Sequence, residues 1–186
     1  ILISRSDSTL RGHFPLETKV LKETIEANSD LRFDGEILFP LFPEGGRYTA
    51  SNIHYVETDG KMIPAGQTEF AKDKTFGYEN SDLAAYVEEK TKGEFLAKDV
   101  ISITLKELRS QDYDGITKKL LTAENFSKIV VNSLTYEDVK VFTIAFLRAL
   151  AAGKNYMFRA AAGIVKVLGG ISDKPLITQE EFAQYG

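Results

Sequence analysis

The sequence has 186 residues, of which 43% are hydrophobic, 27% charged and 11% aromatic. That composition excludes a disordered chain and predicts a domain with a substantial core. The 23 Lys and Arg residues are outnumbered by 27 Asp and Glu residues, giving a net charge of −4 at pH 7. No long basic run occurs, which argues against nonspecific binding to nucleic acids.

Missing residue types narrow the chemistry further. There is no Cys, and His13 and His54 are the only histidines, which excludes disulfides, thiolate nucleophiles and cysteine or multi-histidine metal sites. No apolar stretch approaches the roughly 20 residues that span a bilayer, and no secretory signal is recognisable. We therefore expect a cytoplasmic protein that binds no membrane. Because residues 1–3 resemble the inside of a buried strand, we also expect the natural N-terminus to lie upstream.

Short apolar segments alternate with amphipathic ones along the chain, which predicts strands alternating with helices. In chain order, the expected elements are a strand over 1–4, a helix over 15–28, a strand over 36–39, hairpin strands over 53–56 and 61–63, a helix over 81–92, a strand over 100–103, a short helix after 104, a helix over 116–122, a strand over 128–131, a helix over 136–152, a strand over 155–158 and a helix over 160–168. This order predicts an α/β domain with a mostly parallel sheet, covered by helices on both faces, and a β-hairpin excursion.

Local signals support several of these elements. Thr104 and Thr135 are expected N-caps, and Gly153 is expected to end the 136–152 helix. The first helix is expected to bury one apolar face, made of Leu16, Val20, Leu21 and Ile25. Residues 40–80 interrupt the alternation and are expected to form a long functional excursion.

Polar side chains gather where the predicted strands end. Ligands of open parallel sheets bind beyond the carboxyl ends of the strands. The candidate binding residues at those positions are Arg5, Asp7, Ser8, Thr9, Arg11, Gly12, Arg47, Asn132 and Arg159. Arg supplies bidentate donors for carboxylate or phosphate, while Asp and Asn bind hydroxyls, so the set predicts an anionic, hydroxyl-rich ligand.

Each of these signals also has a structural interpretation. Ser8 and Thr9 can simply form a turn while Asp7 pairs with Arg11, and the residues alone do not decide between turn and site. The 44–47 segment is more typical of a glycine turn than of an oxyanion nest. Neither histidine is predicted to be catalytic. No phosphate-binding loop or dinucleotide fingerprint occurs, so the sequence contains no complete nucleotide site.

The segment Asp7-Ser-Thr-Leu-Arg-Gly12 closely resembles the D-S-T-L-R-G signature of the four-carbon acid sugar kinases, long catalogued as a domain of unknown function and in part as type III effectors. Three further segments agree in order and spacing. Residues 42–49 resemble the family's F-P-x-x-G-R-x-T segment, residues 68–73 its T-E-F-A-x-D segment, and residues 158–162 its F-R-T-A-A segment. His13 and Ala160 depart from the pattern, which more usually has Asn and Thr there.

The resemblance implies a two-domain kinase that phosphorylates a hydroxyl of a tetronate or 3-oxo-tetronate. Residues 1–171 would be its sugar-acid-binding N-terminal domain, incomplete at the N-terminus. Residues 172–186 would be a linker toward a nucleotide-binding domain that this chain lacks. ATP and Mg²⁺ would be bound mainly by that absent domain, so the chain alone is expected to be inactive.

Within that hypothesis, Asp7 is the local candidate for the catalytic base and a ligand of substrate hydroxyls. Arg11 and Arg47 would bind the carboxylate, Asn132 the hydroxyls, and Arg159 the carboxylate or the transferred phosphoryl group. The remaining candidate residues would contribute to substrate binding.

Two other functions stay open. The same edge of the sheet could serve a noncatalytic anion- or sugar-acid-binding module of the effector type. A sugar-acid isomerase or hydrolase would need an acid–base pair beyond Asp7 and Glu69. The sequence predicts neither the stereochemistry of the substrate nor the oligomeric state.

Overall fold

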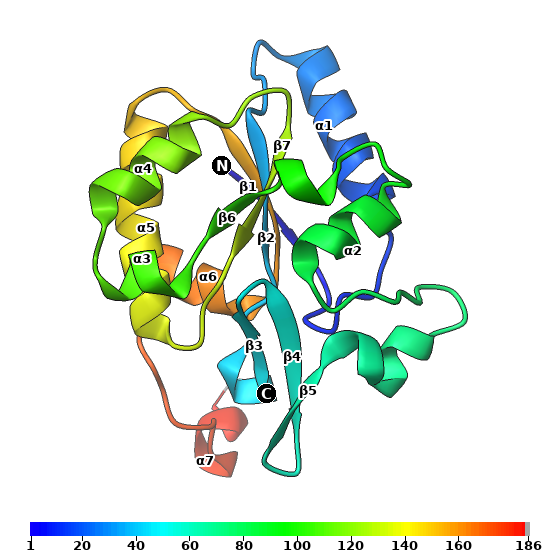
Figure 1. Ribbon diagram of the computed structural model, residues 1–186. Coiled ribbons are helices and arrows are strands. Elements are labelled where there is room, and N and C mark those ends of the chain that lie inside the picture. Colours follow the sequence, from blue (N-terminus) through cyan, green and yellow to red (C-terminus); the bar gives the residue numbers. More distant parts are fainter. Residues whose placement is uncertain (185–186) are drawn as a thin grey trace.

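The computed structural model describes residues 1–184, so the last two residues of the predicted 172–186 tail lie outside the described residues. A five-stranded sheet forms its centre (Figure 1). Its strands lie in the order β1 (Leu2–Arg5), β8 (Tyr156–Ala160), β2 (Gly35–Phe39), β7 (Ser127–Val131) and β6 (Ile101–Ile103). Every neighbouring pair is parallel, which confirms the predicted α/β class.

Helices cover both faces of this sheet (Figure 1). One face carries α3 (Leu105–Arg109), α4 (Tyr113–Leu121), α5 (Tyr136–Ala151) and α6 (Ala162–Leu168). The other carries α1 (Leu16–Asn28) and α2 (Leu83–Lys90). The chain also forms the short 3₁₀ helices η1 (Pro43–Gly45), η2 (Ala65–Gln67), η3 (Glu69–Lys72) and η4 (Ala97–Asp99), and α7 (Gln179–Ala183) lies within the tail.

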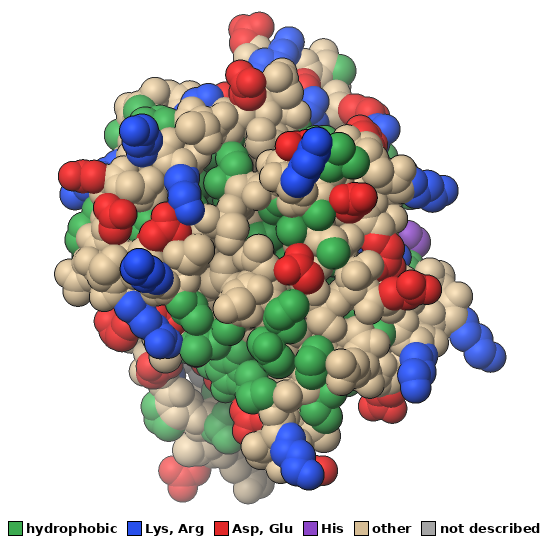
Figure 2. Space-filling model, in the orientation of Figure 1, with side chains coloured by type: hydrophobic (Ala, Val, Ile, Leu, Met, Phe, Trp, Pro, Cys, Tyr) green, Lys and Arg blue, Asp and Glu red, His purple; other side chains and the backbone are tan. Residues whose placement is uncertain are grey.

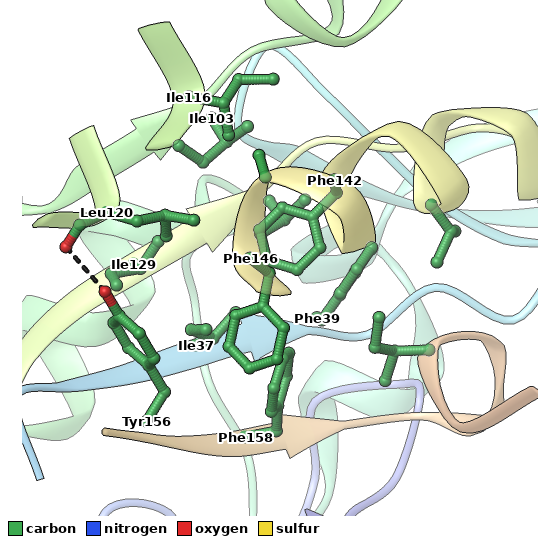
Figure 3. Packing of buried hydrophobic residues seen from close by; sticks show 14 of the residues in the cluster. Ile37, Phe39, Ile103, Ile116, Leu120, Ile129, Phe142, Phe146, Tyr156 and Phe158 are labelled. Atoms are coloured by element: carbon green, nitrogen blue, oxygen red, sulfur yellow. Dashed lines mark hydrogen bonds between the residues drawn. The ribbon is translucent and has the colours of Figure 1, made fainter. Parts of the chain in front are cut away.

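The larger core lies between the sheet and α5. Phe142 and Phe146 stack 5.8 Å apart on that helix, and Figure 3 shows them facing Phe158 and the residues of β2. Tyr156 Oη donates to the Leu120 carbonyl at 2.8 Å, which satisfies the phenol inside the core. The predicted N-cap Thr135 is confirmed and forms a capping box with Asp138. This cap fixes the start of α5, the helix that carries Phe142 and Phe146.

A small antiparallel sheet occupies the predicted excursion. The hairpin is confirmed as β4 (Ile53–Thr58) and β5 (Lys61–Pro64), and an unpredicted strand β3 (Arg47–Ala50) pairs with β4. The turn between β3 and β4 has positive φ at both Ser51 and Asn52, as two-residue hairpins require. Reciprocal backbone bonds between Thr49 and Ser133 attach the small sheet to the end of β7.

The predicted buried face of α1 is wrong in part. Leu16 and Val20 are 60% and 50% exposed, whereas Thr18 is buried and Leu21 and Ile25 pack against the core. The reason is angular, since each helical residue advances about 100°. Residues 18, 21 and 25 therefore share one side of the helix, and residues 16 and 20 lie on the opposite one.

Two boundaries affect the candidate site. The last strand of the sheet runs through Ala160, so Arg159 lies within β8 rather than after it, and α6 begins at Ala162. Figure 2 shows Lys and Arg interspersed with Asp and Glu across the face that it presents. None of the helices within residues 1–184 has the length and hydrophobicity of a membrane-spanning helix.

Candidate functional site

The loop of residues 6–12 follows β1 at the carboxyl end of the sheet. Hydrogen bonds from other segments to its backbone carbonyls hold it in place. Four successive carbonyl oxygens accept hydrogen bonds from buried side chains of distant segments. The pairs are Ser8 with His54 Nε2 at 2.7 Å, Thr9 with Tyr78 Oη at 2.7 Å, Leu10 with Tyr86 Oη at 2.8 Å, and Arg11 with Arg159 Nη2 at 3.1 Å. The conformation of the loop is thereby fixed from four directions.

These hydrogen bonds stabilise an unusual backbone conformation in the loop. Leu10 has a φ of 68° while its side chain is 1% exposed, and Gly12 has a φ of 118°. A non-glycine residue in the left-handed region costs about 1–2 kcal/mol, so it persists where surrounding contacts compensate. Burial of Leu10 and the bonds to the loop carbonyls supply that compensation here.

Asp7 is the polar centre of the loop. Its carboxylate accepts from the Thr9 amide at 3.0 Å, from the Thr9 hydroxyl at 2.6 Å and from Arg11 Nε at 2.8 Å. Partial burial opposes ionisation, but these hydrogen bonds and the Arg11 charge outweigh it and lower the pKa of Asp7. A carboxylate held ionised in this way binds hydroxyls well and takes up a proton reluctantly.

Arg11 and Asp7 line a cavity of about 410 Å³, which we call the Asp7 cavity. Its walls are Ser6, Asp7, Arg11, Gly12, His13, Glu17, Asp73 and Phe76. Arg11 Nη1 lies 3.8 Å from Asp73, whose own carboxylate accepts from the Thr75 and Phe76 amides. These amide bonds lower the pKa of Asp73, so the cavity contains a second carboxylate held ionised.

Arg47 lines a separate cavity of about 470 Å³, which we call the Arg47 cavity. Its walls are Arg47, Val56, Glu57, Thr58, Ile63, Gln67, Thr68, Glu69 and Phe70. Phe70 lines the Arg47 cavity and lies close to both guanidinium groups, because the guanidinium carbons of Arg11 and Arg47 are 5.0 Å and 5.6 Å from the centre of its ring. The structure thus brings Asp7, Arg11 and Arg47 into one neighbourhood.

His54 lies beneath the surface and contacts both the loop of residues 6–12 and the small sheet. It is completely buried, with Nε2 against the Ser8 carbonyl and Nδ1 3.0 Å from Thr49 Oγ1. Burial, aided by the Arg47 charge, lowers the pKa of His54 to about 4. The imidazole is therefore neutral at pH 7, with the Nε2 proton donated to the loop.

Two other predicted ligands lie inside the protein. Arg159 is 4% exposed, stacks 4.9 Å above the Phe14 ring and donates to loop carbonyls. Asn132 is 1% exposed. Its side-chain amide forms hydrogen bonds with Asn52, Ser102 and the Ile103 carbonyl. Neither lines the two cavities, so the structure uses Arg159 and Asn132 to hold loops in place.

The other candidates fall into three positions. Thr9 and Gly12 shape the loop itself, Ser8 contributes its carbonyl, and Arg5 is exposed at the end of β1 and lines neither cavity. The 44–47 segment is the glycine turn that the sequence favours, because the amides of Gly45 and Gly46 donate to the Phe42 and Pro43 carbonyls. Direct binding by any of the predicted residues stays a prediction.

Sequence reasoning assigned no role to several residues that build the site. Asp73 and Phe70 belong to the 68–73 segment, which resembles the family's T-E-F-A-x-D segment. That resemblance was the sequence signal from which a role for them could have been predicted. Tyr78 and Tyr86 carry no comparable signal, because their hydroxyls reach the loop only through the folded chain. Burial raises the pKa of both phenols, that of Tyr86 to about 12, so both remain donors.

A parallel α/β sheet with polar loops and cavities at its carboxyl edge is the arrangement in which α/β domains bind small polar ligands. The model of the family described as "Sugar-binding N-terminal domain" matches residues 1–168, and the chain belongs to this family. The resemblance seen in the sequence is thereby confirmed for the family, while the predicted domain boundary at residue 171 stays a prediction.

Solved structures share the fold. A Haemophilus influenzae protein of the family DUF1537 has a TM-score of 0.62 at 13% identity, over 89% of this chain and 36% of its own. A Bordetella bronchiseptica DUF1537 protein, a domain-swapped dimer with bound citrate, has a TM-score of 0.61 at 20% identity, over 90% of this chain and 35% of its own. This chain therefore spans little more than a third of each. Among curated proteins, none matches this sequence.

Proposed function

We propose that this chain is the substrate-binding part of a cytoplasmic, ATP-dependent kinase that phosphorylates a four-carbon acid sugar, a tetronate or 3-oxo-tetronate. The observation that carries the proposal is the meeting of Asp7, Arg11 and Arg47 around Phe70 at the carboxyl edge of the sheet. Carboxylates for hydroxyls and guanidinium groups for an anion match the two functional groups of a sugar acid. The citrate in the Bordetella relative, a small hydroxy acid, supports that ligand class.

Phosphoryl transfer depends mainly on positioning and charge neutralisation. In this proposal the loop of residues 6–12 holds the accepting hydroxyl through Asp7, and its four anchored carbonyls keep that contact rigid. ATP and Mg²⁺ are assigned to a further domain of the parent protein. A catalytic-base role for Asp7 remains part of the proposal, with positioning of the hydroxyl as its first task.

A noncatalytic sugar-acid-binding module is the second candidate. The lowered pKa of Asp7 favours it, because this carboxylate is a weak proton acceptor within the described chain.

Two measurements separate these candidates. Isothermal titration calorimetry of this chain with the stereoisomeric tetronates tests binding, and absence of heat with every isomer would contradict both. An ATP-consumption assay of the full-length parent with the isomer that binds tests the kinase. Binding without ATP consumption would leave the noncatalytic module.

A further inference from the structure

Apart from the exposed Arg5, the guanidinium groups at this edge of the sheet are those of Arg11, Arg47 and Arg159, and they are not equivalent. Arg11 is paired with Asp7 at 2.8 Å and lies 3.8 Å from Asp73. Arg159 is buried and its Nη2 is committed to backbone carbonyls. Within residues 1–184, by contrast, Arg47 forms no ion pair, and its Nε is buried without a hydrogen-bond partner. A buried donor without an acceptor is costly, so Arg47 is the cation most in need of an anionic partner.

The two cavities also differ in charge. The Asp7 cavity brings two partly buried carboxylates, Asp7 and Asp73, and the exposed Glu17 against the single guanidinium of Arg11. An anionic group entering there meets net repulsion, whereas hydroxyl groups find acceptors in those carboxylates. The carboxylates that line the Arg47 cavity, Glu57 and Glu69, are both exposed, so water screens them from the guanidinium.

The guanidinium groups of the two cavities lie close enough for one small molecule to contact both. The two guanidinium carbons lie no farther apart than the sum of their distances to the Phe70 centre, 5.0 Å and 5.6 Å. An extended four-carbon acid measures roughly 5 Å from its carboxyl carbon to its terminal oxygen by ordinary bond lengths. With a hydrogen-bonded contact at each end, such a chain is long enough to reach from Arg47 to the residues of the Asp7 cavity.

We propose that Arg47 recognises the carboxylate of the ligand, while the Asp7 cavity receives its hydroxyl-bearing end. This orientation rests on the proposed function and revises the expectation that Arg11 and Arg47 share the carboxylate. Arg11 is then a positioning residue that keeps Asp7 and Asp73 in place, and the hydroxyl presented for phosphorylation lies beside Asp7. The selectivity of the domain for acids over neutral polyols resides in Arg47.

The test compares a tetronic acid with its primary amide, which has the same shape and no charge. Calorimetry uses the wild-type chain, Arg47→Gln and the matched variant Arg11→Gln. The wild type is expected to prefer the acid by roughly tenfold or more, because an ion pair with hydrogen bonds replaces hydrogen bonds from the guanidinium to a neutral acceptor. Arg47→Gln is expected to bind acid and amide with equal affinity, having lost the preference for the charged ligand. Arg11→Gln is expected to weaken both ligands by a similar factor and to keep the preference.

Arg47→Lys guards against a merely structural effect, because it keeps the charge and is expected to retain a preference for the acid. If Arg11→Gln abolishes the preference while Arg47→Gln keeps it, the orientation is overturned and sugar-acid binding stands. If Arg47→Lys loses the preference as fully as Arg47→Gln, charge recognition by this residue is likewise overturned. If the wild type binds neither ligand, the proposed function itself fails.

Discussion

His54 shows at the scale of one residue how the site depends on a neutral side chain. The imidazole lies between Thr49 and the Ser8 carbonyl, with the Arg47 charge nearby and Asp7 beyond the loop. Protonation would place a cation in a fully buried position beside a second cation, and Nδ1 would lose its role as acceptor for Thr49. The contact with Thr49 therefore relies on an uncharged imidazole, and so does the balance of charge beside Arg47.

This arrangement predicts a pH dependence of stability. The pKa of His54 is about 4 in the folded chain against an ordinary 6.5, so the unfolded chain binds the proton more tightly. Stability is then complete above about pH 6.5 and falls as the pH drops toward 4, by about 2 kcal/mol between pH 7 and pH 5. Urea unfolding at a series of pH values measures it.

The control for that prediction is His54→Gln, which can still donate to the Ser8 carbonyl but does not titrate. The lowered pKa values of Asp7 and Asp73 act in the range below about pH 4, so they leave the window from pH 7 to pH 5 to His54. An equal loss of stability in wild type and variant across that window would refute the assignment to His54.

The candidate site was predictable from sequence only where its residues are contiguous. Asp7 and Arg11 follow one strand and meet in one turn, so the pattern alone placed them together. Arg159 and Asn132 also lie near strand ends, but a pattern cannot tell a side chain that faces a cavity from one that bonds the protein's own backbone. The place of Phe70 in the site was not predictable for another reason. Its position depends on the path of two 3₁₀ helices, η2 and η3, beside the small sheet.

At the scale of elements, the loop of residues 6–12 is stabilised by segments that the sheet topology brings together. Tyr78 and Tyr86 each donate to one of its carbonyls, and their rings meet edge to face at 5.5 Å. The phenol of Tyr156 makes a similar bond at 2.8 Å, but inside the core near α4, away from the loop. The three tyrosines offer a matched set for separating the effect of the loop from that of general stability.

Removing one phenolic oxygen leaves a buried carbonyl without its donor. Tyr78→Phe, Tyr86→Phe and Tyr156→Phe are each expected to lower the free energy of unfolding by about 1–3 kcal/mol. Only the first two are expected to weaken ligand binding as well, because only they loosen the loop that carries Asp7. Denaturant unfolding and calorimetry on the same samples measure both quantities, and a comparable loss of affinity in Tyr156→Phe would argue against a specific role of the loop.

The elements themselves were largely predictable, because a buried parallel strand needs a short apolar run and a covering helix needs an amphipathic one. Two failures have clear causes. The β3 strand was missed because Ser51 and Asn52 form a tight turn without the glycine that usually marks it. The outward face of α1 was misjudged because apolar residues occur on both of its sides, and only the fold decides which side is buried.

At the scale of the whole molecule, a buried ion pair joins two apolar clusters at the end of the sheet opposite the candidate site. Glu36 and Lys128 lie side by side near the starts of β2 and β7, with their charges 2.5 Å apart and both side chains buried. The ammonium group lies 3.9 Å and 4.2 Å from the Phe126 and Phe95 ring centres. Burial lowers the pKa of Lys128 although Glu36 opposes the shift, so desolvation is not fully offset.

Breaking this pair should therefore be costly, whereas removing both charges should not. Glu36→Gln is expected to destabilise the chain by about 3–5 kcal/mol, because Lys128 stays buried without its counter-charge. The double variant Glu36→Leu with Lys128→Met is expected to recover most of that loss, since well-packed apolar side chains replace the pair. Urea unfolding tests both, and a change below about 1 kcal/mol in Glu36→Gln would contradict the assignment of a buried charge that depends on its partner. Ligand affinity in the folded double variant should equal that of the wild type, because the pair lies beyond the far end of the strands from Asp7 and Arg47.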